Sequence, residues 1–179
     1  MKKTFFALAV ICCAVCNLSA GNNLWDGNAK SLRIIAKEND TKIEVADGKI
    51  TMSGVSAEKR YHYLAFRMRS IKPFIIKEGQ ALQVTFEIAN ATKEDSFYVK
   101  TRTANSKYTT SWNTYNVTGK LQTITFIPGK SGNGISWLAT QVKAPANAVV
   151  TDVEFFFGRR AKKSPMKFTV HKIEIVDVK

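Results

Sequence analysis

Cysteine is confined to the first sixteen residues of this 179-residue chain, at Cys12, Cys13 and Cys16. The remaining sequence therefore has no disulfide, no thiolate metal site and no thiol nucleophile, so an apolar core must stabilise its fold. Histidine is also scarce, with two residues, and neither a Gly-x-Ser-x-Gly nor a His-Glu-x-x-His motif occurs. These absences argue against acyl transfer and against metal-dependent hydrolysis.

The first twenty residues have the layout of a secretory signal peptide. Two lysines precede an apolar run at 5–16, and small residues follow it up to Ala20. The run is too short to span a bilayer, which takes about 20 apolar residues. We expect cleavage after Ala20, with a cut after Cys16 as the alternative. The protein is then secreted, periplasmic or on the cell surface of a bacterium, and residues 21–179 form a single domain.

Basic residues greatly outnumber acidic ones. The chain has 27 Lys and Arg against 14 Asp and Glu, and removing the two lysines of the signal peptide leaves a net charge of +11. Such a field favours anionic partners, for example acidic glycans or envelope polymers, although solubility outside the cell is an alternative explanation. Nucleic acid also fits the charge, but the exported location argues against it.

Short runs of alternating apolar and polar residues recur along the chain, and no segment of normal length has the helical period. Asp47-Gly48, between two such runs, is a strong hairpin signal. Burying one apolar face on each of so many strands requires two antiparallel sheets packed face to face, so we predict an all-β jelly-roll sandwich. The expected strands are 32–36, 42–46, 49–53, 61–69, 81–90, 96–104, 112–117, 121–127, 136–142, 149–158 and 167–178.

The strand order from Tyr61 to Lys179 resembles the galactose-binding-like β-sandwiches, especially carbohydrate-binding module families 4, 9 and 22. The segments that carry the resemblance are YHYLAFRMRSI, EGQALQVTFEIAN, SFYVKTRTA, SWNTYNVTGKLQTITFIPG, TDVEFFFG and FTVHKIEIVDV. Leu82 stands where these families usually have tyrosine, and the last strand ends at the very end of the chain. The resemblance implies carbohydrate binding without bond cleavage, and a structural Ca²⁺ with the candidate ligands Asp40, Asp152 and Asp177.

The polar faces of three expected strands carry the side chains that bind sugars. Aromatic rings cover the C–H surface of a sugar, and guanidinium and carboxylate groups bind its hydroxyls. Neighbouring strands lie about 5 Å apart, so we expect these side chains to form one surface. A solvated sheet face with weak Glu–Arg pairs is the alternative. The candidate ligand-binding residues are Tyr61, Tyr63, Arg67, Arg69, Glu87, Tyr98, Lys100, Arg102, Trp112, Tyr115 and Trp137.

Two tryptophans and a basic run admit two interpretations each. Trp112 and Trp137 are either sugar platforms or packing residues. The run from Arg159 to Lys163 is either a charged hairpin loop or a contact for a sulfated or uronic polymer. Both histidines, His62 and His171, are expected on core faces.

Three functions remain open at this stage. The first is a secreted, non-catalytic carbohydrate-binding module, and the second is a structural or adhesive envelope protein of the same fold. The third is a small glycoside hydrolase or lyase, which needs two carboxylates facing one cleft. Only Glu87 and Glu154 are central to polar strand faces, and nothing in the sequence pairs them. The glycan and the oligomeric state are not predicted.

Overall fold

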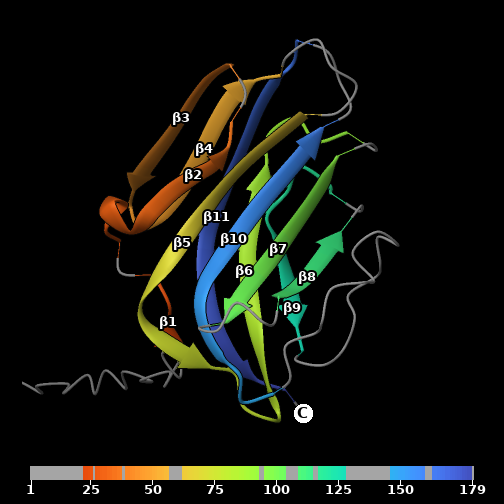
Figure 1. Cartoon of the computed structure of the whole chain (residues 1–179). Coiled ribbons are helices and arrows are strands. Elements are labelled where there is room, and N and C mark those ends of the chain that lie inside the picture. The colour runs from red at the N-terminus through yellow and green to blue at the C-terminus, as the bar shows by residue number, and fades with distance from the viewer. Residues whose placement is uncertain are drawn as a thin grey trace, which may run out of the picture.

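The computed structural model of the 179-residue chain describes residues 22–25, 27–37, 39–56, 62–92, 95–103, 109–114, 117–127, 146–159 and 163–178. Within these residues, strands dominate and the only helical segment is a short 3-10 turn (Figure 1). The elements are β1 (Asn22–Asn23), η1 (Ala29–Ser31), β2 (Leu32–Ala36), β3 (Asn39–Ala46), β4 (Lys49–Val55), β5 (His62–Ile75), β6 (Gln80–Ile88), β7 (Ser96–Thr103), β8 (Thr109–Thr114), β9 (Gln122–Phe126), β10 (Val149–Arg159) and β11 (Pro165–Asp177).

The strands form two antiparallel sheets that pack as a sandwich (Figure 1). Sheet A has the order β3-β4-β11-β6-β9, with β1 also paired to β11. Sheet B has the order β2-β5-β10-β7-β8. This arrangement confirms the predicted all-β, two-sheet architecture.

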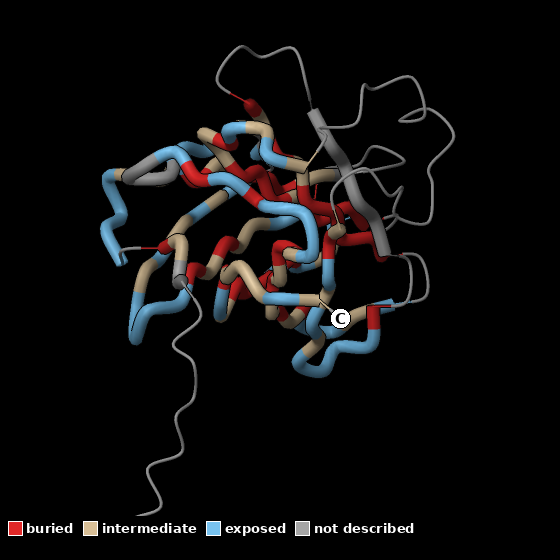
Figure 2. The backbone as a smooth tube through the Cα atoms, turned by 90° about the horizontal axis from the view of Figure 1, so that it is seen from below, coloured by how far each residue is buried: buried red, intermediate tan, exposed pale blue. Residues whose placement is uncertain are grey.

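The core lies between the sheets, and Figure 2 shows the buried stretches of the chain concentrated toward the middle of the molecule. Alternation places one side of each strand there, because successive strand residues point to opposite faces. Aromatic rings connect the layers: Phe86 of sheet A stacks on Phe97 of sheet B with centroids 4.0 Å apart, and Phe66 of sheet B lies 5.6 Å from Phe168 of sheet A. Trp25 is buried in the same cluster.

The predicted hairpin at Asp47-Gly48 joins β3 to β4. Both residues have positive φ, 51° and 70°, which the tight two-residue turns of β-hairpins require. Glycine adopts this conformation without steric cost, and aspartate tolerates it better than most residues.

Several strand boundaries differ from the prediction. β5 continues to Ile75, beyond the predicted end at residue 69. It accommodates Pro73 because this residue lies between Arg69 and Phe74, where the register with β10 is interrupted. β8 begins and ends three residues before the predicted strand, and the two-residue β1 was not predicted. The strand expected at 136–142 lies outside the described residues.

No helical segment among the described residues has the length and apolarity of a membrane span.

Candidate functional site

Sheet B brings the two main runs of predicted binding residues onto one outer surface, which we call face B. Tyr63, Arg67 and Arg69 come from β5, and Tyr98, Lys100 and Arg102 come from β7. Strand β10 lies between β5 and β7, so the prediction that these strands are neighbours was wrong. The two runs are separated by two strand spacings, about 10 Å, instead of one. Face B consists of Arg33, Tyr63, Arg67, Arg69, Tyr98, Lys100, Arg102, Asp152, Glu154 and Phe156.

The register of β10 places its outward side chains between those of its two neighbours. Val153, Phe155 and Phe157 are buried in the core, so the residues that alternate with them face outward. Each outward residue of β10 then faces one partner on β5 and another on β7. The pairs are Asp152 with Arg69 and Arg102, Glu154 with Arg67 and Lys100, and Phe156 with Ala65 and Tyr98.

Glu154 is the centre of a charged network on face B. Its Oε1 accepts hydrogen bonds from Arg67 Nε at 2.8 Å and from Arg102 Nε at 2.6 Å, and Arg67 Nη2 lies 2.7 Å away. The Glu154 side chain is 1% exposed, whereas those of Arg67 and Arg102 are 26% and 35% exposed. One buried carboxylate therefore orients two guanidinium groups that still reach solvent.

Lys100 adds a third positive charge beside this network. Burial lowers the pKa of the Lys100 ammonium below its ordinary value of 10.5, the Glu154 carboxylate opposes that effect, and the guanidinium groups of Arg102 and Arg67 lower the pKa further. The net direction shows that the single carboxylate does not compensate for the burial and for the two positive neighbours.

The aromatic contribution of face B differs from the prediction. Tyr98 is 7% exposed, and its ring is stacked on Phe156 with centroids 4.3 Å apart and planes within 6°. The Tyr98 face that Phe156 covers cannot serve as a sugar platform, so this part of the prediction was wrong. Phe156 is the more accessible ring of the pair. Sequence reasoning missed it, although its position between the core residues Phe155 and Phe157 marks it as outward.

Two other predicted residues keep their places on face B. Tyr63 is partly exposed and lies beside Gly158 of β10, which has no side chain to cover the ring edge. Arg69 is exposed at the opposite end of the face, and so is Arg33 on the neighbouring strand β2. Within the described part of the chain, no ion pair holds Arg69 or Arg33.

Glu87 does not belong to face B. It lies on β6 in sheet A, with Gln83 and Thr85, so the prediction that it shares a surface with Arg67 and Arg102 was wrong. Its Oε1 lies 3.4 Å from Nε2 of His171, which sits at a β-bulge of β11. The His171 side chain is one-fifth exposed and not in the core as expected, because the bulge interrupts the alternation there.

Several predicted residues lie outside the described residues. These are Tyr61, Tyr115 and Trp137, together with positions 160–162 of the basic run. Trp112 is placed in β8 by its backbone, at the register position opposite Val99 of β7, and its side chain is not described.

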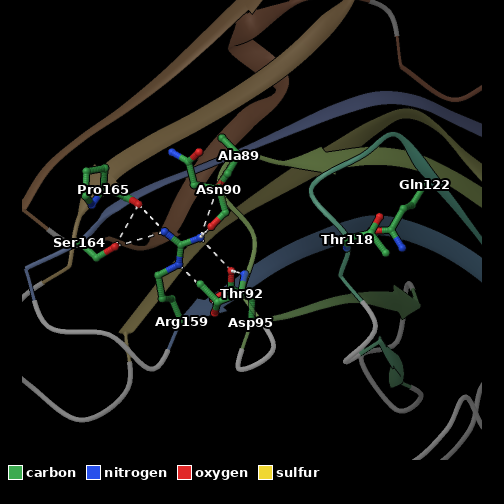
Figure 3. A network of polar contacts seen from close by, with 9 residues as sticks. All are labelled: Ala89, Asn90, Thr92, Asp95, Thr118, Gln122, Arg159, Ser164 and Pro165. Atoms are coloured by element: carbon green, nitrogen blue, oxygen red, sulfur yellow. Dashed lines mark hydrogen bonds and ion pairs between the residues drawn. The ribbon is translucent and has the colours of Figure 1, made fainter.

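Arg159 of the basic run is structural and is not a solvent-facing contact (Figure 3). Its guanidinium group donates to both carboxylate oxygens of buried Asp95, with Nε–Oδ1 of 3.0 Å and Nη2–Oδ2 of 2.8 Å. Its remaining hydrogen bonds reach Ser164 Oγ and the main-chain oxygens of Ala89, Asn90 and Pro165. Arg159 therefore ties the end of β10 to the turns that follow β6 and precede β11, and it is not available to bind a polymer.

The three aspartates proposed for calcium do not meet. Asp152 lies in sheet B, whereas Asp40 and Asp177 lie in sheet A. Asp40 is the second residue of β3 and lies near Val55, which pairs with the first residue of β11, whereas Asp177 is the last residue of β11. At about 3.3 Å per residue, the length of β11 separates these two by more than about 30 Å. Among the described residues, no three potential metal ligands cluster together.

Comparisons with known proteins give similarity in structure only. No protein-family model matches the sequence, and no curated protein matches it. A carbohydrate-binding module of family 28, specific for non-crystalline cellulose, has 10% sequence identity and a TM-score of 0.54, over 87% of this chain and 94% of that one. A structure of carbohydrate-binding modules from the β-sandwich superfamily has 9% identity and a TM-score of 0.53, over 88% of this chain and 62% of that one.

An exo-β-agarase structure is also matched, at 11% identity and a TM-score of 0.49, and this chain spans 24% of its length. The matches to the two module structures establish the fold: the chain is a β-sandwich of the type found in carbohydrate-binding modules. Membership of families 4, 9 or 22 stays a prediction.

Proposed function

We propose that this protein is an exported, non-catalytic carbohydrate-binding module and that face B is its ligand surface. One observation carries the proposal: the outward residues of β5, β10 and β7 form a single surface of rings and guanidinium groups. This is the combination that sugars require, because their C–H patches pack on rings while their hydroxyls accept hydrogen bonds from guanidinium groups. The fold, which is shared with carbohydrate-binding modules, supports the same function.

The rings of face B are suited to this task in different ways. Phe156 is partly exposed, and its stacking on Tyr98 fixes the orientation of its ring. Tyr63 lies two residues from Ala65, the residue opposite Phe156, so the two rings stand on the same face of neighbouring strands. A polysaccharide that crosses the strands can therefore place one sugar residue on each ring.

The carboxylates do not support a glycosidase. Glu154 is buried, and its Oε1 is engaged by two guanidinium groups at 2.6 to 2.8 Å, so this carboxylate is not free to approach a glycosidic bond. Glu87 projects from the opposite sheet. The two cannot face one scissile bond, as both retaining and inverting mechanisms require.

Binding is tested by affinity electrophoresis of the mature protein through gels containing soluble polysaccharides, and by pull-down on insoluble ones that include non-crystalline cellulose. We expect retardation by at least one polysaccharide. Phe156→Ala and Tyr63→Ala should each weaken it by about 5- to 30-fold, because each removes a ring contact. Thr123→Ala, an exposed position on sheet A, is the matched control and should bind normally.

Other results would contradict the proposal. Retention that is unchanged in both ring variants would move the ligand surface away from face B. No retention by any polysaccharide, together with concentration-dependent oligomers, would favour the adhesive envelope protein. Release of reducing sugar from a bound polysaccharide would restore the hydrolase. Mass spectrometry of the exported protein tests the expected start at Gly21.

A further inference from the structure

We infer that face B recognises an anionic glycan and that the guanidinium groups of Arg67 and Arg102 bind a sulfate or carboxylate substituent of the sugar. This inference rests on the proposed function and names the substrate class of the same surface. It follows from the charge of face B, from the geometry around Glu154 and from the position of the adjacent ring.

Positive charge is concentrated on this surface. Face B carries five cationic side chains against two carboxylates, a net charge of +3 within the described residues. The cationic residues are Arg33, Arg67, Arg69, Lys100 and Arg102, and the carboxylates are Asp152 and Glu154. The outer face of sheet A, by contrast, carries four lysines and three glutamates, which are Lys42, Lys49, Lys167, Lys172, Glu44, Glu87 and Glu174. By these residues face B has a net charge of +3 and the outer face of sheet A a net charge of +1, so face B is the more positive surface.

The guanidinium groups are positioned before any ligand arrives. Glu154 engages Nε and Nη2 of Arg67 but only Nε of Arg102. Within the described part of the chain, the Nη groups of Arg102 and the Nη1 group of Arg67 make no further hydrogen bond. A guanidinium group presents five N–H donors in a planar fork that matches an oxoanion. Because Glu154 already restricts both side chains, binding an anion costs less conformational entropy than it would with mobile arginines.

An anion at this position would also relieve an existing electrostatic imbalance. One buried carboxylate serves two guanidinium groups and the Lys100 ammonium opposite it. Burial, together with the repulsion from Arg102 and Arg67, already lowers the pKa of Lys100. A sulfate or carboxylate placed beside these groups supplies the missing negative charge in a partly desolvated site, where the interaction is stronger than in bulk water.

The ring next to the cations restricts the anion to one that a sugar carries. Phe156 is two residues from Glu154 on the same side of β10, which is about 7 Å along the strand. A sugar ring on Phe156 therefore brings a charged substituent of the same or the next residue within reach of Arg67 and Arg102. Acidic polysaccharides have this spacing of ring faces and charges, whereas a free anion gains nothing from Phe156.

The test compares polymers that differ only in charge. Isothermal titration calorimetry with the mature protein would use dextran against dextran sulfate, and homogalacturonan against its methyl ester, at low and at physiological salt. We expect at least one charged polymer to bind at least 10-fold more tightly than its neutral counterpart, and the preference for sulfate or carboxylate to identify the anion. The advantage should diminish as salt is raised, because exposed charges are screened.

Variants distinguish specific binding by the guanidinium group of Arg102 from non-specific attraction by the net positive charge. Arg102→Gln should reduce binding of the charged polymer by about 10-fold or more and binding of a neutral polymer by a much smaller factor, because a neutral sugar loses only a hydrogen bond to a hydroxyl. Arg102→Lys keeps the charge but loses the fork, so it should recover only part of the affinity. Lys167→Gln removes one exposed charge from sheet A and should leave binding unchanged. Circular dichroism of each variant checks that the fold is intact.

Each remaining outcome contradicts a different statement. Equal binding of charged and neutral polymers through face B would overturn the anionic inference and leave the proposed function in place. No binding of either class would overturn the proposed function as well. Equal losses in Arg102→Gln and Lys167→Gln, or equally tight binding of polyacrylate and duplex DNA, would show non-specific attraction by net charge and overturn the inference.

Discussion

The outer surfaces of the two sheets are built on the same antiparallel framework but satisfy their polar groups in opposite ways. On sheet A, neighbouring strands pair their hydroxyls: Thr85 with Thr123, and Thr51 with Thr169, each at 3.0 Å between Oγ1 atoms. On face B, two guanidinium groups converge on one buried carboxylate. The charges on the outer face of sheet A nearly balance, whereas face B keeps surplus guanidinium donors and surplus positive charge. The proposed binding surface therefore differs from the outer face of sheet A in the pairing of its charges and not in polar composition alone.

We expect the buried pair Arg159–Asp95 to contribute more to the free energy of unfolding than the charged network of face B does. Arg159→Met should lower the free energy of unfolding by about 3–5 kcal/mol, because it leaves the Asp95 carboxylate buried without its partner. Urea denaturation measures this against Lys167→Met, an exposed change that should cost less than about 0.5 kcal/mol. A loss below about 1 kcal/mol for Arg159→Met would mean that water replaces the guanidinium group.

The second prediction tests the two outer faces directly through their carboxylates. Glu154→Gln should lower the free energy of unfolding by about 2–3 kcal/mol, because Arg67, Lys100 and Arg102 lose their shared counter-ion. The loss should be smaller than for Arg159→Met, since the arginines of face B still reach solvent.

The matched change on sheet A is Glu87→Gln, which should cost less than about 0.5 kcal/mol because that carboxylate is 46% exposed. Urea denaturation of both variants at pH 7 gives the difference. Equal losses for the two would remove the distinction between the faces.

The sequence was sufficient to predict the sandwich, because alternation and turn residues are local signals. The Asp47-Gly48 hairpin and the core faces of β6 and β7 needed no tertiary information. The set of residues that share face B could not be predicted from the sequence. Strand order depends on how segments far apart in the sequence pair, so nothing local showed that β10 separates β5 from β7 or that Glu87 lies on the other sheet.

Burial of single side chains was equally hidden from the sequence. Arg159 stands in a basic run that reads as a solvent-exposed loop, and only the structure shows its pairing with Asp95. The stacking of Tyr98 on Phe156 likewise needs the register between β7 and β10. Phe156 itself could have been found from its outward parity between two core phenylalanines.

The third prediction uses the charge imbalance of face B. Burial lowers the pKa of Lys100, so the folded chain holds this proton less tightly than the unfolded chain does. Between the lowered pKa and 10.5, the unfolded state binds more protons, and stability rises with pH through that window. Below the window the full cost of charging Lys100 is present. Lys100→Met should therefore raise the free energy of unfolding at pH 7, by an amount that solvent screening of this partly exposed ammonium keeps small.

The same substitution should weaken binding of a charged polymer, which is the expected conflict between stability and function at a binding surface. Urea denaturation at pH 7 and near pH 10 measures the stability effect: the advantage of Lys100→Met over the unmodified protein should shrink at the higher pH. Calorimetric titration with dextran sulfate measures the binding effect. Lys172→Met on sheet A is the control, since Lys172 is half exposed and lies 2.7 Å from Glu174. If Lys100→Met is less stable than the unmodified protein, Lys100 stabilises the fold through Glu154 and is not part of a surplus of positive charge on face B.

The smallest effect is expected for the hydroxyl pairs of sheet A. Removing one partner, as in Thr123→Val, should cost only about 0.5 kcal/mol, because Thr85 is partly exposed and water can replace the lost hydroxyl. Replacing both residues by valine should be nearly neutral, since isosteric apolar pairs suit a β-sheet surface and no donor is left unsatisfied. A double-mutant cycle in urea isolates the pair. If both valines together cost more than about 1.5 kcal/mol, the hydroxyl pairs stabilise sheet A far more than paired, half-exposed groups should. Sheet A would then no longer be the inert counterpart of face B.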